Sequence, residues 1–240
     1  MRTILVTLLL VAFNFIGYSQ KEQVLNRLKE IGIPTDFIEK TDNRNIYAFQ
    51  AENITHSAAF DTVNSKIDKA IYEFNPNANP KYQLKSYDGH LPTEKELQAF
   101  NKKHNAVAST NPPKADIGSL SLISEDNQQI VIGFKIDPKG LTSQNSYLKN
   151  CIGEFYFDKQ SKRLTGASFH STQPFNMSIM KVVKLEVKQQ YMYMLEAGIY
   201  VATKDETHMQ VELPLSFGNA KLTAKGYETT VYSNFKKVNN

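Results

Sequence analysis

The chain of 240 residues has one cysteine and no tryptophan. Small secreted domains of animal proteins are usually stabilised by several disulfides, so a lone cysteine excludes that class of fold. Cys151 lies next to the apolar stretch 152–157. A cysteine in such a stretch is more often a small apolar core residue than a nucleophile or half of an intermolecular disulfide, and we interpret it in the first way.

Patterns that mark metal, cofactor or nucleotide sites are also missing. The five histidines show no helical metal-ligand spacing, and a single cysteine leaves no structural zinc set. There is no glycine-rich phosphate loop and no Gly-x-Ser-x-Gly nucleophile elbow. We therefore expect no metal, no cofactor and no catalytic residue that a motif identifies.

Asp88 and His90, on either side of Gly89, are the nearest approach to an acid–base pair. One interpretation places them in a hydrolase site that is completed by a third polar group in a cleft. The other interpretation, which we favour, is that Asp88 shapes the turn and His90 is solvated. The two interpretations differ in whether the side chains converge.

Positive charge is weak and scattered. The net charge is +4 at pH 7, and the longest basic runs are pairs such as Lys102-Lys103 and Lys236-Lys237. A nucleic-acid-binding protein is expected to gather its positive charge on one face. We therefore expect no nucleic-acid partner.

Residues 1–19 are typical of a cleavable signal peptide. Arg2 supplies the positive charge, residues 4–16 form the apolar run, and Gly17 and Ser19 are the small residues before a cut at Gln20. The apolar run is shorter than the ~20 residues that span a bilayer, and no second such run follows. No cysteine lies near the cut, which excludes a lipid-modified N-terminus. We expect an exported, soluble protein, periplasmic or secreted, with no stable membrane span.

After this leader the sequence changes character once. Residues 20–105 are rich in helix patterns, residues 106–116 are typical of a linker with a Pro-Pro pair, and residues 117–240 are rich in strand patterns. We expect residues 20–105 and 117–240 to form one domain.

Three helices are predicted in the first part. The first begins near residue 20, carries apolar residues such as Leu28 at helical spacing, and ends at Gly32. The second covers residues 58–74, whose apolar residues fit one helical face. The third follows Thr93, which is expected to form a capping box with Glu96. A strand is predicted over residues 82–87, between the second and third helices.

The second part alternates apolar and polar residues. Residues 152–158 and 164–169 form a hairpin pattern around the polar turn 159–162. The clearest alternation places apolar residues at period two from Met209 to Phe217, and Tyr227, Thr229 and Val231 close the series. Runs of strands without intervening helices predict an antiparallel meander.

The stretch Tyr191, Met192, Tyr193 and Met194 is apolar on both faces of a strand. Methionine is adaptable and suits surfaces that accept varied apolar partners, so this stretch is our candidate for binding a lipid-like or peptide ligand. The alternative interpretation is a central strand that is buried on both faces.

Two segments resemble a known kind of protein. Residues 84–96 (LKSYDGHLPTEKE) resemble a segment of uncharacterised exported bacterial proteins in which a strand ending in Asp-Gly is followed by Pro-Thr and a helix. Residues 148–175 resemble the strand–turn–strand in the sheet of the same proteins. Those proteins are similar to the periplasmic carriers of outer-membrane lipoproteins, whose half-open antiparallel barrel holds acyl chains under helices. The resemblance implies a fold, and no ligand-binding residue transfers by motif.

We therefore predict an α+β fold, in which a curved, half-barrel-like antiparallel β-sheet carries two or three N-terminal helices packed against it. The leading functional hypothesis is a non-enzymatic envelope protein that binds an apolar ligand or an envelope partner on the concave face. One alternative is the hydrolase described above. Another is a structural or interaction protein of a secreted assembly, which would show an exposed apolar patch or edge strand. The oligomeric state is left open.

Overall fold

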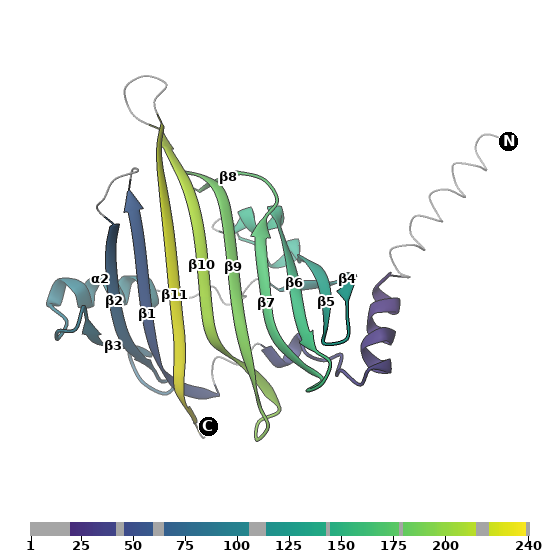
Figure 1. Cartoon of the computed structure of the whole chain (residues 1–240). Helices are drawn as coiled ribbons and strands as arrows, with labels where there is room; N and C mark the ends of the chain where they lie inside the picture. The colour runs from purple at the N-terminus through teal and green to yellow at the C-terminus, as the bar shows by residue number, and fades with distance from the viewer. Residues whose placement is uncertain are drawn as a thin grey trace.

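The computed structural model of the chain describes residues 20–41, 46–59, 65–105, 114–142, 145–177, 180–214 and 221–238. The predicted leader and most of the predicted linker, residues 106–113, lie outside these ranges. The described residues form one antiparallel sheet of 11 strands, with two α-helices and three short 3-10 helices (Figure 1).

The strands are, in chain order, β1 (Tyr47–Ala59), β2 (Ser65–Phe74), β3 (Tyr82–Tyr87), β4 (Ala115–Glu125), β5 (Gln129–Ile136), β6 (Cys151–Asp158), β7 (Arg163–Ser171), β8 (Phe175–Met177), β9 (Met180–Met194), β10 (Ile199–Pro214) and β11 (Lys221–Lys237). Their order across the sheet is β3-β2-β1-β11-β10-β9-β7-β6-β5-β4, and β8 pairs with β9. The last strand, β11, lies between β1 and β10, so strands from both parts of the chain share one sheet.

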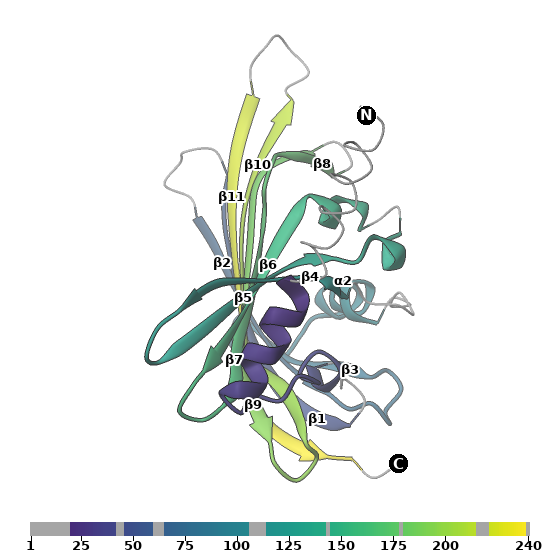
Figure 2. The same ribbon diagram turned by 90° about the vertical axis from the view of Figure 1, so that its right-hand side faces the viewer.

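The helices lie on one side of this sheet. Figure 2 shows the helix of residues 20–30, α2 (Glu94–His104) and the 3-10 helices η2 (Pro138–Gly140) and η3 (Ser146–Asn150) on the same side, toward which the ends of β1, β10 and β11 bend. The remaining 3-10 helix is η1 (Glu39–Thr41). The curved antiparallel sheet with helices on its concave face confirms the predicted fold in outline.

The first predicted helix is confirmed over residues 20–30. It ends at Gly32, whose φ of 78° suits a glycine. The Ile33 N–H donates to the Leu28 carbonyl at 2.8 Å, and the Gly32 N–H donates to the Lys29 carbonyl at 3.0 Å. This pair of hydrogen bonds is the Schellman motif, which satisfies the last carbonyl groups of a helix.

The third predicted helix is also confirmed, as α2. Thr93 is its N-cap: the Thr93 side chain accepts from the Glu96 N–H, and the Glu96 carboxylate accepts from the Thr93 N–H at 2.8 Å. This is the predicted capping box. The predicted strand over residues 82–87 is β3, and the predicted hairpin around residues 159–162 is formed by β6 and β7.

The predicted helix over residues 58–74 is wrong, because residues 65–74 form strand β2. Its β-branched and aromatic residues favour a strand, and β2 pairs with β1 on one side and β3 on the other. Tyr72 and Phe74, two positions apart, are both buried against β1. Tyr72 belongs to a buried cluster that includes a β1 residue, and the ring of Phe74 stacks on a ring of β1. Ile67, in contrast, is 55% exposed. The helical spacing of the apolar residues is therefore coincidental, and residues 65–74 form a strand because they pair with the neighbouring strands β1 and β3.

An apolar core lies at the β4–β7 end of the concave face. Phe37 is fully buried there, with its ring edge-on to Phe155 and Phe157 at centroid distances of 5.1 and 4.8 Å. Val24 and Leu28 of the first helix pack in the same cluster. Over the described residues no helix is both long and apolar enough to cross a membrane.

Candidate functional site

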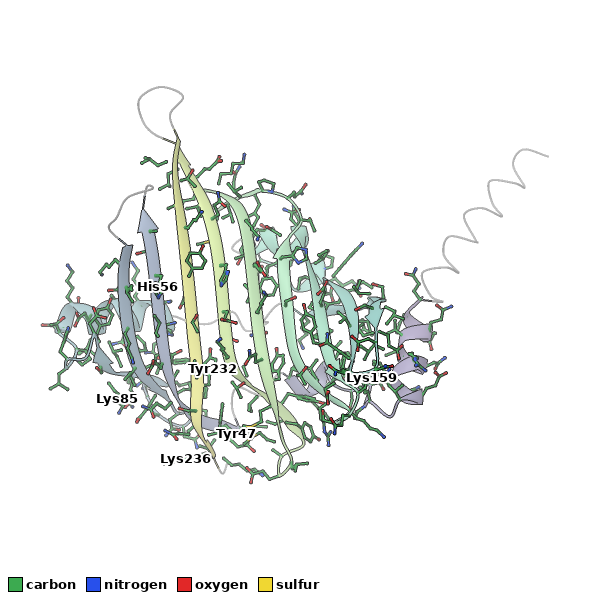
Figure 3. All side chains as sticks on the ribbon, viewed as in Figure 1. Tyr47, His56, Lys85, Lys159, Tyr232 and Lys236 are labelled. Atoms are coloured by element: carbon green, nitrogen blue, oxygen red, sulfur yellow. The ribbon has the colours of Figure 1, made fainter. Side chains whose placement is uncertain are left out.

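The candidate site is a pocket of about 270 Å³ under the C-terminal end of α2. Strands β1, β2, β3, β10 and β11 contribute its other residues. Its lining consists of Phe49, Tyr72, Tyr82, His104, Asp205, Thr207, Glu228, Thr230 and Tyr232. Figure 3 labels Tyr232 on β11, in the half of the sheet that carries α2.

Strand alternation explains why these side chains share a face. Successive residues of a strand point to opposite faces, and directly paired residues of neighbouring strands point to the same face. Glu228, Thr230 and Tyr232 are alternate residues of β11, as Asp205 and Thr207 are of β10. The paired row that runs along this face from the apolar core to β2 is Phe155, Ala167, Gln189, Asp205, Thr230, Asn53 and Ala70.

Aromatic rings form the walls of the pocket. The ring of Tyr72 lies 6.1 Å from Tyr82 and 5.1 Å from His104, and the ring of Phe49 lies 5.2 Å from Tyr232. His104 in turn stacks on Phe100 of α2 at 4.3 Å. Such contacts hold the rings in fixed orientations around the space between them.

The floor is polar and hydrogen-bonded. The Tyr232 hydroxyl donates to Asp205 Oδ2 at 2.7 Å, and Gln189 Nε2 donates to Asp205 Oδ1 at 3.1 Å. Glu228 Oε1 accepts from Asn53 Nδ2 at 2.8 Å and from Lys103 Nζ at 2.9 Å. Asp205 and Glu228 are thus positioned by their neighbours, as preorganised binding groups are.

The protonation states at neutral pH follow from the surroundings. Burial alone would raise the pKa of Glu228, but the hydrogen bonds from Lys103 and Asn53 outweigh it and the pKa is lowered. Burial, with a smaller contribution from Lys103, lowers the pKa of His104 to about 4. Burial raises the pKa of Tyr232 well above its usual value. At pH 7 Glu228 is therefore ionised, while His104 and Tyr232 are uncharged.

Helix α2 is fixed to β3 next to the pocket. The Tyr82 N–H donates to Asn105 Oδ1 at 3.1 Å, and Asn105 Nδ2 donates to the Tyr82 carbonyl at 3.0 Å. Phe100 of α2 is 8% exposed and packs against Tyr72. These contacts bring Lys103 and His104, in the last turn of α2, to the rim of the pocket.

The predicted stretch Tyr191–Met194 does not line this pocket. Tyr191 and Tyr193 pack against the apolar core, Met194 packs beside Tyr47, and Met192 is 43% exposed. Tyr191 is nevertheless linked to the pocket, because its hydroxyl donates to Gln189 Oε1 at 2.8 Å and Gln189 donates to Asp205. Binding at residues 191–194 stays a prediction.

Asp88 and His90 do not converge in a cleft. Asp88 Oδ1 accepts from the Lys69 N–H at 2.7 Å, and His90 Nε2 lies 3.8 Å from a Glu96 carboxylate oxygen. Both side chains are exposed. This placement matches the interpretation of a turn-shaping aspartate and a solvated histidine.

The remaining candidates are Cys151 and a cluster of metal ligands. Cys151 is 2% exposed within an apolar cluster, and burial raises the pKa of its thiol, in agreement with a core role. Within the described ranges no three or more His, Cys, Asp or Glu side chains are grouped so as to hold a metal ion.

Sequence reasoning missed the polar floor, although one signal was present. Asp205 and Thr207 are in phase with Met209 and Val211, so a carboxylate lies on the face that the apolar residues of β10 mark as buried. In β11 the alternation that begins at Tyr227 indicates the wrong face of the strand. Tyr227 is 43% exposed, and the polar residues Glu228 and Thr230 face inward.

The fold and the pocket define a class of protein: an open, curved antiparallel sheet with helices on its concave face and a small site beneath one of them. No protein-family model and no curated protein matches the chain. Among solved structures, it is similar to a LolA superfamily protein from Nitrosomonas europaea, at 13% sequence identity and a TM-score of 0.32, over 85% of this chain and 91% of that one.

Proposed function

We propose that the protein is a non-enzymatic binding protein of the bacterial envelope, which holds a small, partly apolar molecule in the pocket under α2. The observation that carries the proposal is the pocket itself. Aromatic walls with a few fixed polar groups are typical of small-molecule sites. The residues that would bind are those of the lining, with Tyr72, Tyr82 and Tyr232 as the main apolar contacts.

The size of the pocket limits its occupant. Its volume of about 270 Å³ lies just below the range of about 300–1,000 Å³ that is usual for ligand pockets. This favours a small molecule, or the end of a larger amphipathic one, over a site that encloses several acyl chains.

The envelope location rests on the leader. Residues 1–19 have the features of a signal peptide, and the single cysteine suits an exported bacterial protein without disulfides. Secretion beyond the cell would leave the binding proposal unchanged.

A filled-pocket variant tests the proposal. Thr207→Phe inserts a ring into the pocket, and Thr229→Phe places the same ring on the opposite face of the neighbouring strand. We expect native mass spectrometry of protein purified from its own cells to detect a small bound molecule in the wild type and in Thr229→Phe, and not in Thr207→Phe. A wild type that is empty, or two variants that retain the molecule equally, would contradict the proposal.

A second candidate function is a structural or interaction protein. Among the described residues β4 is one end strand of the sheet, and its Leu122 and Ile123 are 49% and 55% exposed. Exposed apolar edge strands can pair with another chain, although the irregular pairing of β4 with β5 opposes a long new ladder. Self-association detected by analytical ultracentrifugation, and lost in Ile123→Lys, would favour this candidate.

A further inference from the structure

The pocket lining is electron-rich, and the cation beside it, Lys103 at the rim, is already paired with Glu228. Two of its residues, Asp205 and Glu228, are acids, and its one basic side chain, His104, is uncharged at neutral pH because its pKa is about 4. The other lining residues are aromatic or hydroxyl-bearing. Building on the proposed function, we infer that the molecule bound in this pocket carries a positively charged amine, held between Asp205 and Glu228 inside the aromatic walls.

The register of the sheet brings the two carboxylates close together. Asp205 pairs with Thr230, and Thr207 pairs with Glu228, so Asp205 and Glu228 are diagonal neighbours on β10 and β11. Diagonal neighbours lie roughly 7–8 Å apart, which places both carboxylates within reach of one group between them. Charge-assisted hydrogen bonds from an ammonium to two carboxylates are strong in a partly dehydrated site.

The aromatic walls suit the same group. Tyr72, Tyr82 and Phe49 present rings to the pocket, and an ammonium or alkylammonium is attracted to the face of such a ring. The apolar parts of the rings can meanwhile bind the alkyl portion of the ligand. A carboxylate or phosphate would face Asp205 and Glu228, and the nearby Lys103 ammonium is already paired with Glu228, so an anion is disfavoured there.

An amine of the protein itself already lies at this position. Lys103 Nζ is 2.9 Å from Glu228 Oε1, and the Lys103 side chain is 57% exposed, at the rim of the pocket. Glu228 thus accepts an alkylammonium group in the structure. Lys103 competes with an incoming amine for that oxygen, and its long, exposed side chain can turn into solvent when the amine takes its place.

Three probes with the same chain and different heads test this inference: octylammonium chloride, 1-octanol and sodium octanoate, each measured by isothermal titration calorimetry at pH 7. We expect octylammonium to bind most tightly and octanoate most weakly. Glu228→Gln should weaken octylammonium binding by about tenfold or more, because a charged hydrogen-bond partner is lost. Lys103→Met should strengthen it, because the competing ammonium is removed.

Matched variants separate binding from folding. Glu206→Gln changes a carboxylate of the neighbouring strand β10 that pairs with Lys204 on the opposite face of the sheet, and Lys102→Met changes the neighbour of Lys103 on α2. Neither should change octylammonium binding. If Glu228→Gln fails to fold, the gain of binding in Lys103→Met still decides the question, since a merely structural ion pair predicts a loss.

The outcomes distinguish this inference from the proposed function. Binding of 1-octanol or octanoate as tight as that of octylammonium, or weaker octylammonium binding in Lys103→Met, would overturn the amine while leaving a binding pocket. Failure of all three probes to bind would contradict the pocket as a site for small amphipathic molecules as well.

Discussion

The two ends of the concave face are built in opposite ways. At the β4–β7 end the first helix and Phe37 cover the sheet with a continuous apolar cluster, and Phe37 is fully buried. At the β1–β3 end α2 covers aromatic residues around a pocket with a polar floor. Figure 3 labels Lys159 and Tyr232 on these two halves of the sheet. One helix thus completes a core, and the other leaves a space that a ligand can enter.

The largest effect is expected at the packed end. Phe37→Ala removes a ring that touches Phe155 and Phe157 and leaves a cavity. A change of this kind lowers the free energy of unfolding by about 3–5 kcal/mol. Urea denaturation monitored by circular dichroism measures it, and Leu97→Ala on the exposed side of α2 is the control, with an expected change within about 0.5 kcal/mol. Equal effects of the two variants would remove the contrast between the ends.

The pocket end should respond to pH through His104. Burial lowers the pKa of His104 to about 4 from an ordinary 6.5, so the folded state disfavours the protonated ring. The free energy of unfolding is therefore at its full value above pH 6.5, where His104 is neutral in both states. It decreases as the pH falls from 6.5 toward 4, because the unfolded chain takes up the proton more readily. The loss is on the order of 1 kcal/mol, since the ring is partly solvated.

His104→Phe tests this assignment, because it keeps the ring that stacks on Phe100 and removes the titrating group. The variant should show a flatter stability between pH 6.5 and 4 than the wild type in urea titrations at each pH. Identical curves for the two proteins would show that His104 is not the group responsible.

The two ends also differ in what the sequence could reveal. The end of the first helix and the capping box of α2 are local patterns, and residues such as Gly32 and Thr93 specify them by themselves. The inward face of β11 depends on pairing with β1, which is far away in the sequence, and β2 is a strand because it pairs with β1 and β3, which the periodicity of its own residues does not show. Glu228 faces inward because β11 lies between β1 and β10, where Asn53 and Thr207 share its face, and no nearby residue encodes that. The only sign of the polar floor in the sequence is therefore that Asp205 occupies the same alternating positions as the apolar residues of β10.

The cap of α2 gives a smaller effect that is confined to the pocket end. Thr93→Ala removes the side-chain oxygen that accepts from the Glu96 N–H, which costs about 1 kcal/mol of helix stability. Because α2 contacts mainly β3, we expect amide exchange to accelerate in α2 and to stay unchanged in β5 and β6. Thr93→Ser keeps the oxygen and should exchange as the wild type does. Faster exchange throughout the sheet would mean that α2 is part of the same cooperative unit as the core.

The smallest effect is expected from an ion-pair cluster at the packed end. Glu125 accepts from Arg27 at 2.7 Å and from Lys159 Nζ at 2.8 Å, and these contacts hold the pKa of Glu125 at about 2. A lowered carboxyl pKa stabilises the fold above the ordinary value near 4.5, and this contribution is lost as the pH falls from 4.5 toward 2. Since Arg27 is exposed to solvent, the energy is small and is screened by salt.

Glu125→Gln should therefore lower stability slightly at pH 7 and abolish only the part of the acid dependence below pH 4.5. That window lies mostly below the one assigned to His104, with an overlap between pH 4.5 and 4, so the double variant with His104→Phe should flatten both parts of the curve. Urea titrations from pH 7 to pH 2.5 at low and at high salt measure this, and additivity is expected because the groups lie at opposite ends of the sheet. A strong departure from additivity would mean that the two ends of the concave face respond to pH as one unit, despite their different construction.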